Sequence, residues 1–312
     1  MYNILITEEF DRNAINKLKE LNFNVIEKFY KQNELGDKLR QFDAIIMRSV
    51  TEITKEVIDK ACENSKLKLI VKAGVGIDNI EVEYAMEKGI KVINTPNSSS
   101  ISVAELTIGH IFALSRFVNI SNVTMRQGKW EKKKYEGTEI NGKTLGLIGF
   151  GRIGKEVAKR AEALGMKVIY NDILGKFEGY DKYKSCKLDE LLSKSDFISL
   201  HIPYDKNIGT VITKKEIAKM KDGVYLINCA RGKVISEEDL LDELNNEKIK
   251  GAALDVFEEE PTTNMKLINH PRACVTPHIG ASTKEAQERI GDEVVNILRD
   301  YFDIDDLVDV AL

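Results

Sequence analysis

The chain has 312 residues, of which 43% are hydrophobic and 31% charged, and it carries a net charge of -4 at pH 7. This length exceeds what one hydrophobic core usually organises, so we expect two domains. The acidic balance argues against a general attraction to nucleic acid or to anionic membranes, and the composition argues against disorder.

Val- and Ile-rich segments alternate with helical patterns in the first third of the chain. Helices are expected over residues 11–21 and 80–88. Strands are expected over 3–7, 24–27, 43–49, 68–74 and 91–95. A strand–helix rhythm of this kind is typical of a parallel sheet with helices on both faces.

The most apolar long segment follows, over residues 101–120. Glu105, His110 and Arg116 interrupt it, and these side chains would be costly inside a bilayer. We therefore predict a single buried helix that lies between domains or subunits. The polar residues 126–143 come next and mark the join to a second domain.

The same rhythm restarts after residue 140 and predicts a second doubly wound sheet. Helix starts are signalled by Thr213-x-x-Glu216 and Ser236-x-x-Asp239. A last helix over 283–301, opened by Ser282-x-x-Glu285, could return to the first sheet and make that domain discontinuous. The second set of strands is expected over 144–149, 167–170, 196–203, 224–230, 251–257 and 273–277.

A glycine-rich turn follows the first strand of the second sheet. It has the pattern G-x-G-x-x-G, formed by Gly149, Gly151 and Gly154 with Arg152 and Ile153 between them. Between a strand and a helix, this pattern allows a tight bend, a close approach of pyrophosphate to backbone, and close helix packing. Alone it is weak evidence, because such turns also serve only to tighten a corner.

Asp172 ends the next strand, where a carboxylate can accept hydrogen bonds from an adenosine ribose. The same charge would repel a 2'-phosphate, so NAD is favoured over NADP. The alternative is that Asp172 is a solvated turn residue.

Chemically useful residues follow the later strands, at the sheet edge where ligands of such folds bind. Hydride transfer at a carbinol carbon needs a group that moves the hydroxyl proton, for which His278 is our candidate. Glu260 would favour the protonated form of His278, and Arg231 suits two-point binding of a substrate carboxylate.

Taken singly, each of these three residues could be an ordinary turn or surface residue. We interpret His110 and His270 as structural. The other residues expected beside the cofactor are His201, Pro203, Cys229, Ala230, Asp255 and Gly280.

The segments "GFGRIG", "INCARG", "AALDVFEEEP" and "TPHIGAST" together resemble the D-isomer-specific 2-hydroxyacid dehydrogenases. The resemblance implies that Arg231, Glu260 and His278 are catalytic, and that Asp255 lies beside the nicotinamide carboxamide. It also implies an α/β fold of two doubly wound parallel-sheet domains. A Rossmann-type NAD domain, residues 98–285, would be inserted in a flavodoxin-like substrate domain formed by 1–97 and 286–312.

Within this family, "KAGVGIDNI", "NTPN" and "AELT" look most like the enzymes that oxidise 3-phospho-D-glycerate in serine synthesis. A phosphorylated substrate needs cations, and Arg48 and Lys72 end two strands of the smaller domain. Backbone around Val75 and Gly76 could hold the substrate carboxylate. Lys132 resembles a position that contributes charge from a neighbouring subunit, although a solvated lysine is equally expected there.

Several alternatives use the same residues. A glyoxylate or hydroxypyruvate reductase, or a D-lactate enzyme, would differ only in pocket charge. An NADH-sensing corepressor-like protein would bind the cofactor without turnover, and formate dehydrogenase is a weaker alternative.

The remaining expectations concern partners and compartment. We expect a homodimer or a dimer of dimers, no metal, and no nucleic-acid or membrane partner. The four cysteines form no C-x-x-C pair, which favours the cytoplasm. Because the sequence ends at Leu312, no regulatory serine-binding domain and no inhibition through one are expected.

Overall fold

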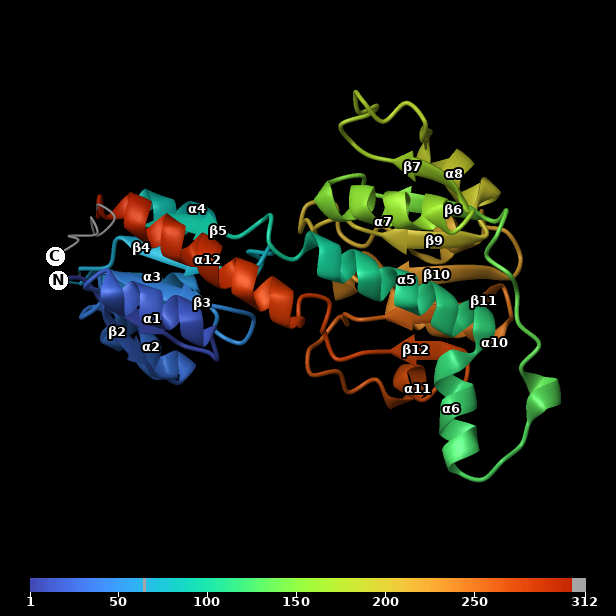
Figure 1. The fold of residues 1–312 in the computed structure, drawn as a ribbon, viewed down its shortest axis with the longest axis horizontal. Coiled ribbons are helices and arrows are strands. Elements are labelled where there is room, and N and C mark those ends of the chain that lie inside the picture. Colours follow the sequence, from blue (N-terminus) through green and yellow to red (C-terminus); the bar gives the residue numbers. More distant parts are fainter. Residues whose placement is uncertain (64–65, 305–312) are drawn as a thin grey trace, which may run out of the picture. The chain divides into compact units, whose positions relative to one another are not determined.

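A computed structural model describes residues 1–63 and 66–304 and divides the chain into two compact units (Figure 1). Unit 1 is Met1–Ser99 with Ala281–Leu312, and unit 2 is Ser100–Gly280. The sequence predicts domain boundaries between residues 97 and 98 and between residues 285 and 286. The second boundary in the structure, after Gly280, falls five residues earlier than this prediction. The final eight residues of the predicted substrate domain lie outside the described residues.

Unit 1 contains a five-stranded parallel sheet with the order β2-β1-β3-β4-β5, which is the flavodoxin-like order. All five strands were predicted. Their bounds are β1 Asn3–Ile6, β2 Asn24–Glu27, β3 Ala44–Met47, β4 Leu69–Lys72 and β5 Lys91–Asn94. Its helices are α1 Arg12–Glu20, α2 Gln32–Leu39, α3 Lys55–Cys62, α4 Val82–Glu87 and α12 Lys284–Tyr301.

Two hydrophobic clusters cover the two faces of this sheet. Ile4 and Ile6 of β1 face α1 and α12, whereas Leu5 faces α2 and α3, as the period of two requires. The last helix therefore returns to the amino-terminal sheet, as expected. Its N-cap is Thr283, whose hydroxyl accepts from the Ala286 N–H, and not the expected Ser282.

Unit 2 contains a seven-stranded parallel sheet with the order β12-β11-β10-β9-β6-β7-β8, a Rossmann-type arrangement. Its strands are β6 Thr144–Ile148, β7 Lys167–Asn171, β8 Lys184–Ser185, β9 Phe197–Leu200, β10 Val224–Asn228, β11 Ile249–Leu254 and β12 Ala273–Val275. Only β8 was not predicted, because two polar residues give no apolar run.

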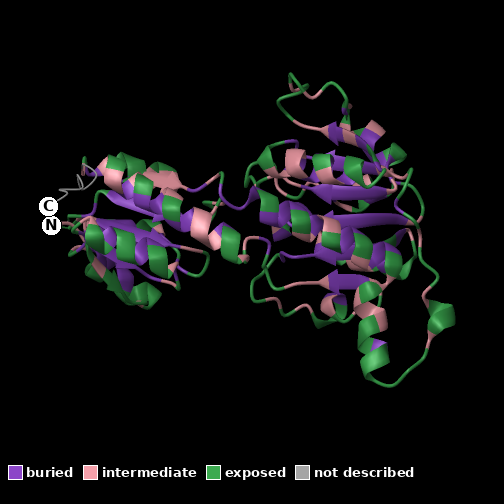
Figure 2. Cartoon of the chain, viewed as in Figure 1, coloured by how far each residue is buried: buried purple, intermediate pink, exposed green. Residues whose placement is uncertain are grey.

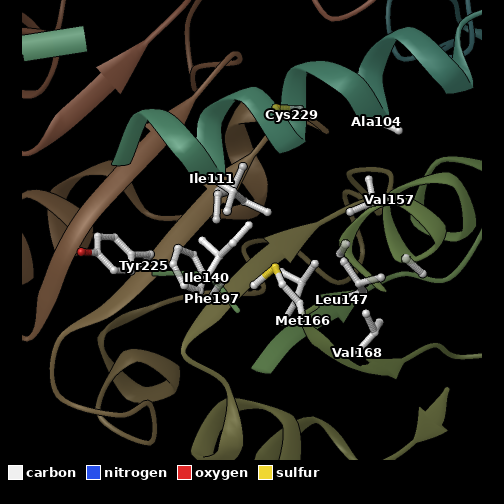
Figure 3. Close-up of a cluster of buried hydrophobic side chains, with 14 of the residues drawn as sticks. Ala104, Ile111, Ile140, Leu147, Val157, Met166, Val168, Phe197, Tyr225 and Cys229 are labelled. Atoms are coloured by element: carbon white, nitrogen blue, oxygen red, sulfur yellow. The ribbon is translucent and has the colours of Figure 1, made fainter. Parts of the chain in front are cut away.

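The helices of unit 2 cover both faces of the sheet. On one face lie α5 Ser100–Arg116 and α7 Arg152–Ala163. On the other lie α8 Leu188–Lys194, α9 Lys214–Ile217, α10 Glu237–Asn245 and α11 Met265–Ile268. Figure 2 shows the strands as the buried layer, and Figure 3 shows Ile111 of α5 among buried side chains of the sheet that include Leu147 and Phe197.

Two of the predicted helix starts are confirmed. Thr213 and Glu216 form a reciprocal capping box at α9. Ser236 caps α10 by accepting a hydrogen bond from the Asp239 N–H at 3.2 Å.

The long apolar helix expected over 101–120 is two helices. α5 ends at Arg116 and α6 runs over Val118–Arg126, because Phe117 between them adopts a left-handed conformation with φ 55°. The Phe117 ring packs 5.8 Å from that of Tyr135, which comes later in the chain. Among the described residues, no single helix is long and apolar enough to cross a membrane; α5 and α6 reach that length only as a pair bent by 65°.

Candidate active site

The glycine turn links β6 to α7. Gly149 has φ 93°, and a Cβ there would lie 2.5 Å from the carbonyl oxygen of His201. A Cβ at Gly154 would lie 2.4 Å from the carbonyl oxygen of Gly149. The space beside Gly151 is open, and no side chain caps α7. The turn thus needs two glycines for its own packing and leaves the third, at a helix start, accessible to a phosphate.

Asp172 lies beside this turn. Its Oδ2 accepts a hydrogen bond of 2.7 Å from the Phe150 N–H, and its Oδ1 accepts one of 2.9 Å from the Leu174 N–H. A carboxylate has about four acceptor positions, so capacity remains for ribose hydroxyls. Asp172 therefore positions the turn as well as presenting negative charge next to it.

His201 and Pro203 follow β9 on the same side as the turn. The His201 Nε2 lies 3.0 Å from the Ser199 hydroxyl, and its buried Nδ1 has no hydrogen-bond partner among residues 1–63 and 66–304. Burial lowers the pKa of His201 to about 3, so this imidazole is neutral at physiological pH and cannot act as an acid. The exposed Pro203 stands at the surface beyond it.

The residues after β10 are mostly buried. Cys229 and Ala230 are each 8% exposed. Burial raises the pKa of the Cys229 thiol to about 12, which keeps it protonated and unreactive. Any role of these two residues beside the cofactor is therefore one of backbone and packing.

Glu260 and His278 form a close pair. Glu260 Oε2 lies 2.6 Å from His278 Nδ1, and 36% and 41% of the two side chains are exposed. Glu260 Oε1 accepts a hydrogen bond of 3.0 Å from the Phe257 N–H. Although burial alone would raise it, the contact with His278 lowers the pKa of Glu260, which favours the carboxylate. With Nδ1 on the carboxylate, Nε2 is the nitrogen left to a substrate.

Arg231 completes the group. Its guanidinium donates to the carbonyl of Ala230 at 2.6 Å, and its charge contributes to the lowered pKa of Glu260. A cation, a carboxylate and an imidazole from three separate segments therefore lie close together in unit 2.

Two neighbours that were not predicted hold Arg231 in place. The Asn228 amide donates to the Arg231 carbonyl at 2.8 Å and accepts from the Ala230 N–H at 3.0 Å. A Cβ at Gly232 would lie 1.8 Å from the carbonyl carbon and oxygen of Phe257. The arginine segment therefore lies directly against the backbone of the segment that carries Glu260, and only glycine permits this contact.

A second contact fixes the glutamate segment. Glu237 and Glu258 exchange hydrogen bonds, each carboxylate accepting from the other residue's N–H at 2.8 Å. Asn264 donates to Glu237 at 2.8 Å. No sequence signal pointed to these residues, because a glutamate in the first turn of a helix is common.

Asp255 is buried, with 1% of its surface exposed, and holds the segment that carries His278. It accepts hydrogen bonds of 2.8 Å from the N–H groups of Ile279 and Gly280 and one of 2.6 Å from the Thr276 hydroxyl. The residue between these donors, His278, has φ 53°. Asp255 thus supports a backbone conformation that a residue with a side chain rarely adopts.

The predicted substrate residues of unit 1 have different surroundings. Lys72 is 5% exposed, and its ammonium donates to the Arg48 carbonyl at 2.5 Å and to the Asn79 side chain at 2.7 Å. It supports the loop after β3 from inside and does not stand at the surface. The N–H of Arg48 donates to Glu8 at 2.9 Å, and its guanidinium contacts the Glu9 carbonyl at 3.3 Å.

The last predicted positions lie in loops. Val75 is 37% exposed, and its carbonyl accepts from the Asn94 amide at 2.6 Å; Gly76 follows it, partly exposed. Lys132 is exposed in the short 3-10 turn Lys132–Lys134 of unit 2.

A Rossmann-type sheet with a phosphate-binding turn, and a histidine, a carboxylate and an arginine at the carboxyl ends of its strands, defines a nucleotide-dependent dehydrogenase. Residues 108–280 match the NAD-binding domain of the D-isomer-specific 2-hydroxyacid dehydrogenases. The chain belongs to this family.

Relatives with known names agree on the family and differ in substrate. Hydroxypyruvate reductase of Thermotoga maritima is 45% identical over 94% of this chain and 96% of its own length. D-3-phosphoglycerate dehydrogenase of Methanocaldococcus jannaschii is 41% identical over 96% of this chain and 58% of its own length. The solved structure of D-lactate dehydrogenase from Aquifex aeolicus, with NAD and lactic acid, has a TM-score of 0.84 at 32% identity and covers 96% of each chain.

NAD is the cofactor of this domain, and the residues present fit it. The open space beside Gly151 and the uncapped start of α7 suit a pyrophosphate, and Asp172 suits the adenosine ribose.

Proposed function

We propose that the chain catalyses the reversible, NAD-dependent oxidation of 3-phospho-D-glycerate at C2 to 3-phosphohydroxypyruvate. The observation that carries the reaction type is the 2.6 Å contact between Glu260 and His278, with Arg231 beside it, at the strand ends that also hold the glycine turn. Oxidation of 3-phospho-D-glycerate would place the protein in serine synthesis.

Arg231, His278 and Glu260 have different roles in the proposed reaction. Arg231 binds the substrate carboxylate and orients C2. His278 takes the hydroxyl proton on Nε2, and Glu260 stabilises the imidazolium that results. Bound NAD supplies the hydride acceptor. In the reduction direction His278 returns the proton to the carbonyl oxygen.

We propose a phosphorylated substrate because the chain has cationic side chains that could bind its phosphate group. Arg48 stands at the end of β3, and Lys132 is exposed on its loop. A 3-phosphate carries close to two negative charges, so both would strengthen its binding. The D-3-phosphoglycerate dehydrogenase of Methanocaldococcus jannaschii, which is 41% identical to this chain, supports the same substrate.

Reduction of hydroxypyruvate or glyoxylate is the second candidate. Two observations favour it: the ammonium of Lys72 is bound inside unit 1, and a hydroxypyruvate reductase matches this chain over nearly its full length. Such an enzyme would use the same three catalytic side chains with a less cationic pocket.

A substrate panel decides between them. NADH formation from 3-phospho-D-glycerate is compared with that from D-glycerate and D-lactate, and NADH consumption with hydroxypyruvate and glyoxylate is measured in parallel. We expect kcat/KM to be at least about tenfold higher with the phosphate, and to lose that advantage in Arg48→Gln. Equal or better turnover of the unphosphorylated acids would move the assignment to the reductase; NADH binding without any turnover would indicate a sensing protein.

We further propose that two copies of the chain associate through α5, α6 and the loop that follows. This face exposes large apolar side chains that a monomer would leave in water: Phe112, Val118, Val123, Met125 and Trp130. Sedimentation of the wild type should give a dimer or tetramer, and Val123→Asp with Trp130→Asp should give a monomer. A monomeric wild type would contradict this proposal.

A further inference from the structure

His110 lies inside unit 2, on α5, with 3% of its surface exposed. Its two ring nitrogens both have partners from the segment that leads to His278. Nδ1 lies 3.6 Å from the Cys274 sulfur, and Nε2 lies 3.2 Å from the Thr276 hydroxyl. A buried histidine held on both sides in this way is more than a space-filling side chain.

The direction of each hydrogen bond follows from counting protons. The single hydroxyl proton of Thr276 goes to Asp255 Oδ1, at 2.6 Å, so Nε2–H of His110 must be the donor toward Thr276. Burial lowers the pKa of His110, so its ring carries one proton and Nδ1 is an acceptor. Cys274, whose thiol is also kept protonated by burial, can then donate to it.

This series of hydrogen bonds, from His110 through Thr276 to Asp255, leads to the backbone around His278. Asp255 accepts from the N–H groups of Ile279 and Gly280, which directly follow His278. The left-handed φ of 53° at His278 persists only if its neighbours are held. Asp255 would lose one of its three donors if Thr276 turned its hydroxyl elsewhere.

We infer that His110 is a positioning residue: through Thr276 and Asp255, it fixes the backbone around His278 and so the alignment of the imidazole with Glu260. The inference rests on the proposed function only for the activity readout. A hydrophobic side chain at position 110 would fill the same space on an apolar helix, but it would leave Thr276 free to reorient.

Paired variants test this inference on the full chain. Thr276→Val removes the hydroxyl with little change in shape, and Thr276→Ser restores it. His110→Leu removes the donor, and His110→Gln replaces it. Ser115→Ala is the matched control, because Ser115 is fully buried on the same helix and its hydroxyl donates to the Phe112 carbonyl, one turn away on that helix.

Two readouts are measured: steady-state kinetics with the best acid of the substrate panel, and amide hydrogen exchange at residues 279 and 280. For Thr276→Val and His110→Leu we expect kcat to fall about tenfold with KM within about twofold, and exchange at 279 and 280 to quicken about tenfold. Thr276→Ser, His110→Gln and Ser115→Ala should stay within about threefold of the wild type in both readouts.

Wild-type exchange and wild-type kcat in Thr276→Val would overturn the inference. An equal loss in Ser115→Ala would also overturn it, because the effect would then be general to the helix. If His110→Leu does not fold, the Thr276 pair still decides. If the wild type turns over no 2-hydroxy acid, the proposed function fails while the exchange readout still judges the positioning role.

Discussion

His278 combines an unusual backbone with an ordinary chemical role. His278 has a φ of 53° and lies in a loop whose backbone is bound by Asp255. Its Nδ1 is hydrogen-bonded to Glu260. The geometry leaves one nitrogen for the substrate hydroxyl. His201, which lies beside the glycine turn, is neutral at physiological pH and is thereby separated from proton transfer.

Replacing His278 tests this division. His278→Asn should lower kcat by about 10² to 10⁴, the range supplied by a positioned acid–base group, while NAD affinity changes by less than about threefold. Steady-state kinetics and fluorescence titration with NADH check the two parts. His270→Asn is the control histidine, and normal turnover in His278→Asn would disprove the assignment.

Asp172 should set the choice of dinucleotide. Asp172→Ala removes the charge that repels a 2'-phosphate and also two hydrogen bonds that shape the turn. The NAD dissociation constant should rise at least about tenfold, and the preference for NAD over NADP should shrink. Calorimetric titration with both dinucleotides measures this; Asp181→Ala, at an exposed ion pair, is the control.

The lowered pKa of Glu8 predicts that the free energy of unfolding depends on pH. Burial alone would raise its pKa, but three backbone N–H groups, from Val50, Thr51 and Arg48, lower it below the ordinary 4.5. A lowered pKa in the folded state means that this stabilisation is complete above pH 4.5 and is lost as the pH falls through the folded value. Glu8→Gln should therefore cost about 1 kcal/mol at pH 7, reduced by the partial exposure of the carboxyl, and much less at pH 3. Denaturant unfolding at both pH values checks the difference, and an equal loss at both would contradict it.

At the scale of elements, the strands were easier to predict than the connections. Val- and Ile-rich runs predict eleven of the twelve strands in the described residues, because most of these strands are largely buried and read as apolar runs. The break at Phe117 has no local signal, since no glycine or proline stands there and the ring packs on Tyr135. Contacts between loops, such as that of Gly232 with Phe257, are likewise invisible in sequence spacing.

The candidate site follows the same pattern. Strand ends and residue types predict Arg231, Glu260 and His278, because parallel strands bring their carboxyl ends to one edge. The residues that hold them, such as Asn228 and Glu237, act through hydrogen bonds to neighbouring backbone, for which the sequence has no periodic signature.

Gly232→Ala tests the contact between the arginine and glutamate segments. The added Cβ would overlap the Phe257 carbonyl at 1.8 Å, so one segment must move. A shift of about 1 Å typically costs about 10² in rate, and kcat/KM should fall by that factor or more. Gly109→Ala is the control, because open space surrounds that helical glycine and alanine favours helix. Equal kinetics in the two variants would exclude a tight contact at Gly232.

On the scale of the whole molecule, the catalytic side chains and the dinucleotide turn all belong to unit 2, a continuous segment, whereas unit 1 is assembled from both ends of the chain. Cofactor binding and the proposed proton transfer thus depend on residues of one continuous segment. The cations proposed to choose the substrate are divided between Arg48 of unit 1 and Lys132 of unit 2.

NAD should therefore stabilise unit 2 directly. At 100 times its dissociation constant, a ligand adds about 2.7 kcal/mol to the folded state that binds it. Hydrogen exchange with and without NAD should show the strongest protection in β6, the glycine turn and the end of β7. Protection confined to unit 1 would contradict the placement of the cofactor.

The bare backbone contact at Gly232 limits how this catalyst can be altered. The backbone at Gly232 lies directly against that of Phe257 and Glu258, so neither segment can change course there unless the other follows. A graft of new substrate loops onto this scaffold must therefore exchange both of these segments together, and a new loop after β3 must keep the backbone groups that bind Glu8 and Lys72.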